Sequence, residues 1–296
     1  MGRSRWAIEA GLAVVAIAIV AAVAIVVSLG PSEPGSGGHA GMVMPQAGAP
    51  AATTAPHSDG LTDSELGFRL SPVTIPTERG VEQPVAFRII GPSGAPETRF
   101  ELNATKELHF FVVRDDMTGY QHRHPVPDGD VWRTTVSVPD GGTYRMYAEF
   151  VPKGSTDFMH PTVLGVSFII PGDTAFVPLP EPAAVATAGP FTVTRPDGPA
   201  QPIVRQLGEL RFAITDTAGA PAPLSPHLGS YGHMSAFNAL SQSVTHLHPL
   251  QPVGAGGPPR ELTFQAQFAE RGEHRLFLEF AAGGEVRIAE FTLFVT

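Results

Sequence analysis

Short runs of apolar residues, separated by turn sequences, fill most of the chain beyond residue 67. In the first half, runs with strand composition lie at 85–90, 108–114, 131–138, 144–150 and 163–170. The segments 91–94 and 140–142 are Gly-containing turn sequences between such runs. No stretch among them has the spacing of a long amphipathic helix. The pattern predicts an all-β chain of short strands, as in a β-sandwich of the immunoglobulin type.

The second half of the chain repeats the first. Phe87 and Pro96 have counterparts in Phe212 and Pro221, each 125 residues later. The two halves are separated by a stretch rich in Pro and Ala, which is typical of a linker. We therefore predict two tandem immunoglobulin-like β-sandwiches. They are expected at 67–175 and 191–296, with the linker at 176–190.

The beginning of the chain has a different pattern. Arg3 and Arg5 precede an uncharged apolar run at 11–29. A helix of this length, at about 1.5 Å per residue, spans roughly 28 Å, close to the hydrocarbon core of a bilayer. Basic residues before the run predict a single-pass anchor at 1–30, with a cytoplasmic N-terminus and an extracytoplasmic bulk. A cleaved signal peptide is the alternative.

A segment rich in Gly, Pro, Ala, Ser and Thr follows at 31–66, and we interpret it as a disordered, flexible stalk. It contains His39, Met42 and Met44. Thioethers and imidazoles are good ligands for reduced copper, so this segment is either a copper-capturing element or a plain linker.

Composition excludes several classes of function. The formal net charge is -9 without a basic stripe, which excludes nucleic acid as a partner. The chain has no cysteine, and therefore no disulfide, thiolate metal site or cysteine nucleophile. The Gly-x-Ser-x-Gly, His-Glu-x-x-His and phosphate-loop motifs are missing from the sequence. We therefore do not expect an enzyme.

Histidines recur at one spacing in both halves. His122 and His124 form a His-x-His-Pro motif, and a third histidine, His109, stands 13 residues before it. The second half repeats this set as His233, His246 and His248. On an extended strand, residues two apart point the same way, and 13 residues suit a strand, a turn and a return strand. We predict a three-nitrogen metal site in each half; the alternative is a set of structural, hydrogen-bonded histidines.

A later strand carries charged residues on one face. Arg145 and Glu149 alternate with apolar residues in the first half, and Arg275 and Glu279 do so in the second. The two glutamates are candidates to hold a histidine by its other nitrogen, to pair with the neighbouring arginines, or to act as a fourth ligand. We expect the outer-shell or ion-pair role.

Imidazole ligands without thiolates suit Cu(II) or Zn(II), and a nitrogen site binds Cu(II) more tightly. The sequence therefore favours a copper ion, with zinc as the second choice and no metal at all as the remaining alternative.

Three sequence elements also resemble a family of membrane-anchored or secreted bacterial proteins. They are Lys-Glu-Leu-His at 106–109, the His-x-His-Pro motif at 122–125 and Tyr-Arg-Met-Tyr-Ala-Glu-Phe at 144–150. The modules are similar to YtkA-like and CopC-like envelope domains, which are associated with copper handling. The resemblance implies an immunoglobulin-like fold outside the cytoplasm. The N-terminal histidine of copper carriers of that type has no counterpart here.

Together these features predict a cell-membrane protein that buffers or delivers copper. The first alternative is a structural or protein-interaction module of the envelope, with another envelope protein as partner. The second is an enzyme with a three-histidine zinc site.

Overall fold

The computed structural model describes residues 58–198, 200–254 and 256–296, and its regular structure there is entirely β-strand. The predicted all-β class is confirmed. The predicted anchor at 1–30, and the stalk with its Met and His residues up to residue 57, lie outside the described residues. Within the described ranges, no helix is long and apolar enough to cross a membrane.

The first β-sandwich contains two sheets. One consists of β1 (Ser64–Glu65), β2 (Phe68–Thr74), β3 (Gly80–Ile90), β8 (Val131–Val138) and β7 (Val126–Asp128), paired in that order, with β4 (Pro96–Glu97) on β3. The other consists of β10 (Thr162–Ile170), β9 (Gly142–Phe150), β5 (His109–Arg114) and β6 (Gln121–Arg123), also in that order. Phe87, Phe110 and Trp132 are among the large side chains buried in their common core. Burial of this apolar surface is the main force that holds the sheets together.

The second β-sandwich has a similar plan, with its strands joined differently at β16. Its strands are β11 (Val185–Ala188), β12 (Phe191–Thr194), β13 (Gly208–Thr215), β14 (Leu224–Ser225), β15 (His233–Asn238), β16 (Val244–Pro249), β17 (Glu261–Ala266), β18 (Gly272–Ala282) and β19 (Glu285–Val295). Strand β16 pairs with β15 and, at His248 and Pro249, with β17, so it joins both sheets into one path. In the first sandwich the equivalent stretch is divided into β6 on β5 and β7 on β8.

The strand registers reproduce the repeat seen in the sequence. The equivalent cross-strand pairs are His109–Glu149 and His233–Glu279, followed by Phe111–His122 and Ser235–His246. The repeat is therefore a repeat of structure as well as of sequence. Both sandwiches begin earlier than predicted, because β1 lies inside the expected stalk and β11 inside the expected linker. These strands are two and four residues long, too short to show an alternating pattern.

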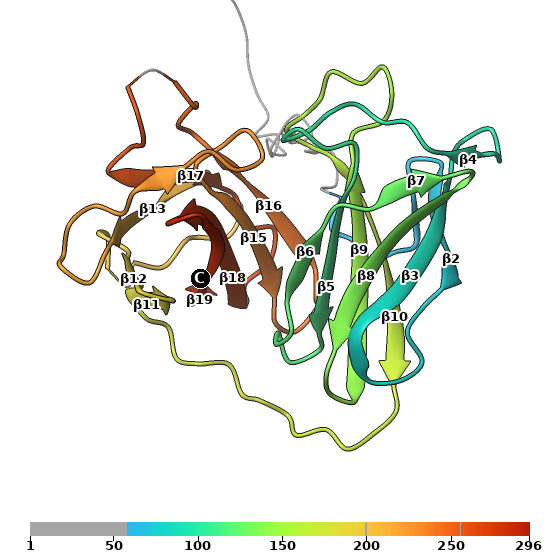
Figure 1. Cartoon of the computed structure of the whole chain (residues 1–296), viewed down its shortest axis with the longest axis horizontal. Coiled ribbons are helices and arrows are strands. Elements are labelled where there is room, and N and C mark those ends of the chain that lie inside the picture. The colour runs from blue at the N-terminus through green and yellow to red at the C-terminus, as the bar shows by residue number, and fades with distance from the viewer. Residues whose placement is uncertain (1–57, 199, 255) are drawn as a thin grey trace, which may run out of the picture. The chain divides into compact units, whose positions relative to one another are not determined.

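A third hydrophobic cluster is shared by the two sandwiches. It includes Phe111, Val113 and Tyr147 from the first, and Phe237, Val244 and Phe277 from the second. Strands alternate their side chains between two faces, so β5 sends Phe110 into its own core and Phe111 into the shared cluster. Figure 1 shows β5 and β6, in green, next to β15 and β16, in orange. The two histidine-bearing sheets thus meet through their outer faces.

Candidate metal centre

Three histidines of the first sandwich converge on one point. His109 begins β5, His122 lies in β6, and His124 follows β6 directly. Leu108 and Phe110 point into the core of the first sandwich, so His109 between them points to the outer face. The short turn between β5 and β6 returns the chain beside β5 and brings His122 onto that face. The predicted hairpin therefore places all three imidazoles together.

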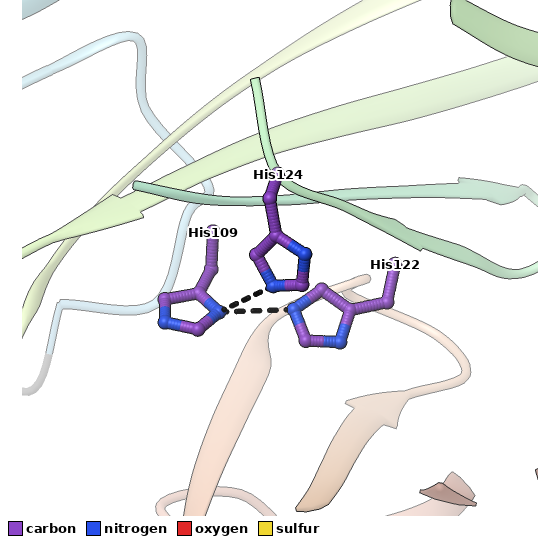
Figure 2. Close-up of side chains that lie close together, drawn as sticks. All are labelled: His109, His122 and His124. Carbon is purple, nitrogen blue, oxygen red and sulfur yellow. Dashed lines mark hydrogen bonds between the residues drawn. The ribbon is translucent and has the colours of Figure 1, made fainter. Parts of the chain in front are cut away.

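The ring nitrogens are close enough to share one ion. His109 Nδ1 lies 3.0 Å from His122 Nε2 and 3.3 Å from His124 Nε2. One nitrogen from each ring lies within 4.8 Å of the others. Figure 2 shows the three rings turned toward this common point. Zinc–nitrogen bonds of about 2.0–2.1 Å would place two ligand nitrogens of a tetrahedral site roughly 3.3 Å apart. The observed spacing fits such a site.

The outer nitrogens of two rings already have acceptors. His109 Nε2 donates to the carbonyl oxygen of Asn103 at 2.9 Å. His122 Nδ1 donates to Oε2 of Glu279 at 3.1 Å. A neutral imidazole carries one proton, so the nitrogens that face the centre, His109 Nδ1 and His122 Nε2, keep their lone pairs. Metal-binding histidines are typically oriented by hydrogen bonds of this kind.

Burial keeps the third ring neutral. It lowers the pKa of His124 to about 2, and repulsion from the His122 and His109 rings, when these are protonated, lowers it further. His109 itself is 4% exposed. A neutral imidazole offers the lone pair that a metal ion needs.

Glu279 belongs to this centre although it lies in the second sandwich. Sequence reasoning placed it beside the second histidine set; the structure shows it bonded to His122 of the first. Burial by itself raises the pKa of Glu279, but the hydrogen bond from His122 and the neighbouring imidazoles outweigh it and hold the pKa below its usual range. Glu279 is therefore a carboxylate that accepts the hydrogen bond from His122 Nδ1. No sequence signal could reveal this contact, because it depends on how two sheets pack.

The other predicted outer residues are Glu149 and the two arginines. Glu149 is buried and faces His109 across the ladder. Arg145 instead donates to the carbonyl oxygen of Gly60 and to Ser167. Arg275 pairs with Glu290 and donates to Thr292. Each arginine therefore bonds groups outside the histidine set, and not the glutamate of its own strand with which an ion pair was a candidate.

The second histidine set is described only in part. His233 Nε2 donates to the carbonyl oxygen of His227 at 2.9 Å, as His109 does to Asn103. Burial lowers the pKa of His233. His246 and His248 belong to β16, but their side chains lie outside what the structure describes. A second metal site thus stays a prediction.

A cavity of about 390 Å³ adjoins the first centre. Residues of both sandwiches line it, among them His109, His122 and Glu149 from the first, and Ser230 and His233 from the second. The three-histidine centre therefore has open space on one side, where an ion can enter.

The sequence matches a protein family over both sandwiches. The family is described as Domain of unknown function (DUF8832), and the match covers residues 64–166 and 187–296. The chain belongs to this family. Comparison with curated proteins found no match. The family description names no metal, so the copper association remains a proposal.

Solved structures show only a distant likeness. The S-layer protein rSbsC(31–844) is 10% identical, with 77% of this chain and 28% of that chain covered and a TM-score of 0.23. Invasin, a bacterial integrin-binding protein, is 11% identical, with 77% and 39% covered and a TM-score of 0.23. A Salmonella alpha-2-macroglobulin mutant is 11% identical, with 82% and 16% covered and a TM-score of 0.26. This chain spans well under half the length of each. These likenesses carry no argument about function.

Proposed function

We propose that this protein is an extracytoplasmic, membrane-anchored metal-binding protein that buffers or delivers copper. The converging nitrogens of His109, His122 and His124 are the observation that carries the proposal. Two of these rings are oriented by hydrogen bonds from their outer nitrogens, which distinguishes the group from a chance cluster of surface histidines.

Copper is favoured over zinc by the chemistry of the ligands. An imidazole site without thiolates binds Cu(II) more tightly than Zn(II). The resemblance to YtkA-like and CopC-like envelope domains supports the same choice. The basic residues and apolar run before residue 30 support a membrane location, and a cysteine-free chain is compatible with an oxidising compartment. The lack of catalytic sequence motifs supports binding rather than catalysis.

Titration calorimetry tests the proposal on the full chain in detergent. His246→Ala/His248→Ala removes two ligands of the second set and isolates the first centre. In this background we expect one equivalent of Cu(II) to bind, and additional His122→Ala/His124→Ala to abolish that binding. His160→Ala, an exposed histidine paired with Asp157, is the matched control and should bind normally. Binding that is unaffected by loss of both His122 and His124 would refute the proposed centre.

Affinity should also depend on pH. Ligation needs neutral imidazoles, so Cu(II) binding should weaken where acid protonates a ligand ring. Burial lowers the pKa of His124 and moves that loss to a lower pH than the usual 6.5 of histidine. A binding constant that rises as pH falls would contradict imidazole ligation.

A structural or interaction module is the alternative function. The bond from His122 to Glu279 connects the two sandwiches, and this favours a structural role for that histidine. In that case His122→Ala/His124→Ala lowers the melting temperature equally with and without a chelator. A melting temperature of the wild-type protein that rises with added metal favours the metal-binding function instead.

A further inference from the structure

The first metal centre takes side chains from both sandwiches. His109 is held by a carbonyl group of its own sandwich, whereas His122 is held by Glu279 on β18 of the second. The side chains of His122 and Glu279 are only 5% and 6% exposed. Water is therefore a poor replacement for either partner, and loss of this bond would leave a buried polar group unsatisfied. The orientation of His122 consequently depends on the position of the second sandwich.

Neighbouring contacts fix that position. Tyr120, two residues before His122, stacks on Phe277 with ring centroids 4.0 Å apart and planes 8° apart. The Tyr120 hydroxyl donates to Oγ of Ser235 at 3.2 Å. Phe277 and Glu279 are alternate residues of β18 and share the face that meets the first sandwich. The same sheet face thus carries both the docking contact and the histidine contact.

Glu279 acts through His122 rather than on the ion. Its Oε2 accepts from Nδ1, while Nε2 of the same ring faces the centre. A carboxylate in this place fixes the tautomer and the direction of the ring.

We propose that Glu279 is a positioning residue of the first metal centre, so that metal binding and docking of the second sandwich are thermodynamically linked. This inference rests on the proposed metal binding. Linkage is reciprocal: if the docked arrangement raises metal affinity, the metal stabilises docking by the same factor. Separation of the two sandwiches then weakens metal binding, which is a means of release.

Zinc titrations of the full chain in the His246→Ala/His248→Ala background test the positioning role. We expect Glu279→Gln to weaken Zn(II) binding by about 10–100-fold, the usual effect of losing such a partner. Glu273→Gln, an exposed glutamate on the same strand, is the matched control and should bind as the parent does.

A second pair of variants tests the linkage without touching the centre. Phe277→Leu weakens the stack on Tyr120 and should lower zinc affinity by about fivefold or more. Phe291→Leu removes similar volume from the separate core of the second sandwich and should leave affinity unchanged. If Phe277→Leu fails to fold, Ser235→Ala removes the hydrogen bond between Tyr120 and Ser235 and should still lower affinity.

Spin labels report docking directly, because the chain has no cysteine of its own. Labels at Ser93→Cys and Thr217→Cys, both exposed and in different sandwiches, should give a narrower distance distribution when zinc is added. Unchanged affinity in Glu279→Gln, Phe277→Leu and Ser235→Ala, with normal binding by the parent, would overturn the linkage and leave the metal centre intact. Absence of binding by the parent would instead overturn the proposed function.

Discussion

The two sandwiches keep the same polar set but surround it with different neighbours. Each places a histidine opposite a glutamate, and each directs that histidine's Nε2 to a carbonyl six residues earlier. Across the ladder from the next histidine, the first sandwich has Phe111 and the second has Ser235. The polar residues are the same in both sandwiches although this neighbour differs, which indicates that the polar set has a task beyond packing.

The sandwiches differ most in how they stabilise the turn after the first histidine strand. The first has a buried ion pair between Arg114 and Asp116. The equivalent positions of the second are Asn238 and Leu240. Asn238 accepts from the backbone N–H groups of Leu240 and Ser241 instead. One turn therefore depends on charge and the other does not.

Removal of equivalent core rings should have the largest effect. Phe87 and Phe212 occupy matching positions and are both fully buried. We expect Phe87→Ala and Phe212→Ala each to lower the free energy of unfolding by about 3–5 kcal/mol, through lost burial and a residual cavity. Urea denaturation measures this. Phe176→Ala, at an exposed side chain, is the control, with a change within about 0.5 kcal/mol. If either core variant lowers the free energy of unfolding by less than about 1 kcal/mol, the two rings do not play equivalent roles in their cores.

Neutralising the ion pair should affect only the first sandwich. Burial raises the pKa of Asp116, but hydrogen bonds from Arg114, Thr118 and the backbone of Val177 outweigh it and leave the pKa well below its usual value. Asp116→Asn should cost about 1.5–3 kcal/mol at pH 7.

The cost should shrink with acid. The unfolded carboxyl protonates near pH 3.9 and the folded one only at lower pH, so the contribution of Asp116 is complete above pH 4–5 and is lost as pH falls below that. Denaturation of wild type and variant from pH 7 to 3 measures this. Asp130→Asn, an exposed carboxylate paired with Arg88, should change stability little. A difference in stability between wild type and Asp116→Asn that widens as pH falls would contradict a stabilising role for the Asp116 carboxylate.

A histidine of the second sandwich should add a pH dependence near neutrality. His274 is buried where the first sandwich has Tyr144, and burial lowers its pKa. In the unfolded chain His274 takes up a proton near pH 6.5, whereas in the folded chain it stays neutral. As pH decreases below 6.5, the free energy of unfolding therefore decreases by at most about 1.4 kcal/mol per pH unit. His274→Gln should remove this part of the slope between pH 6.5 and 5. An unaltered slope would show that His274 does not contribute.

The smallest effect concerns one hydroxyl at the docking face. Tyr147 donates to the carbonyl oxygen of Gln242 in the second sandwich at 2.6 Å, whereas the equivalent Phe277 has no hydroxyl. Tyr147→Phe should lower the free energy of unfolding by about 0.5–1.5 kcal/mol. Thermal denaturation measures it, and no change in stability would mean that water replaces the carbonyl's partner.

The sequence predicts those features that depend on local geometry. The alternation of apolar residues indicated the strands, and the 13-residue spacing of His109 and His122 indicated their hairpin. The face of β9 that carries Glu149 followed from the period of two. These predictions hold because each depends on one strand or on two strands joined by a short turn.

Features that depend on the packing of the two sandwiches could not be predicted from the sequence. Glu279 contacts His122 from 157 residues away, and no periodicity specifies that pairing. Arg275 forms an ion pair with Glu290 on β19 rather than with Glu279 on its own strand. Both outcomes depend on which surfaces meet, and a strand pattern defines only which side chains share a surface.

X-ray absorption of the copper-loaded full chain tests the central claim most directly. In the His246→Ala/His248→Ala background with one equivalent of Cu(II), we predict a first shell with three imidazole nitrogens at about 2.0 Å. Additional His109→Ala should remove one imidazole from that shell. A spectrum with fewer than two imidazoles, or one identical with and without His109, would contradict a centre built from His109, His122 and His124.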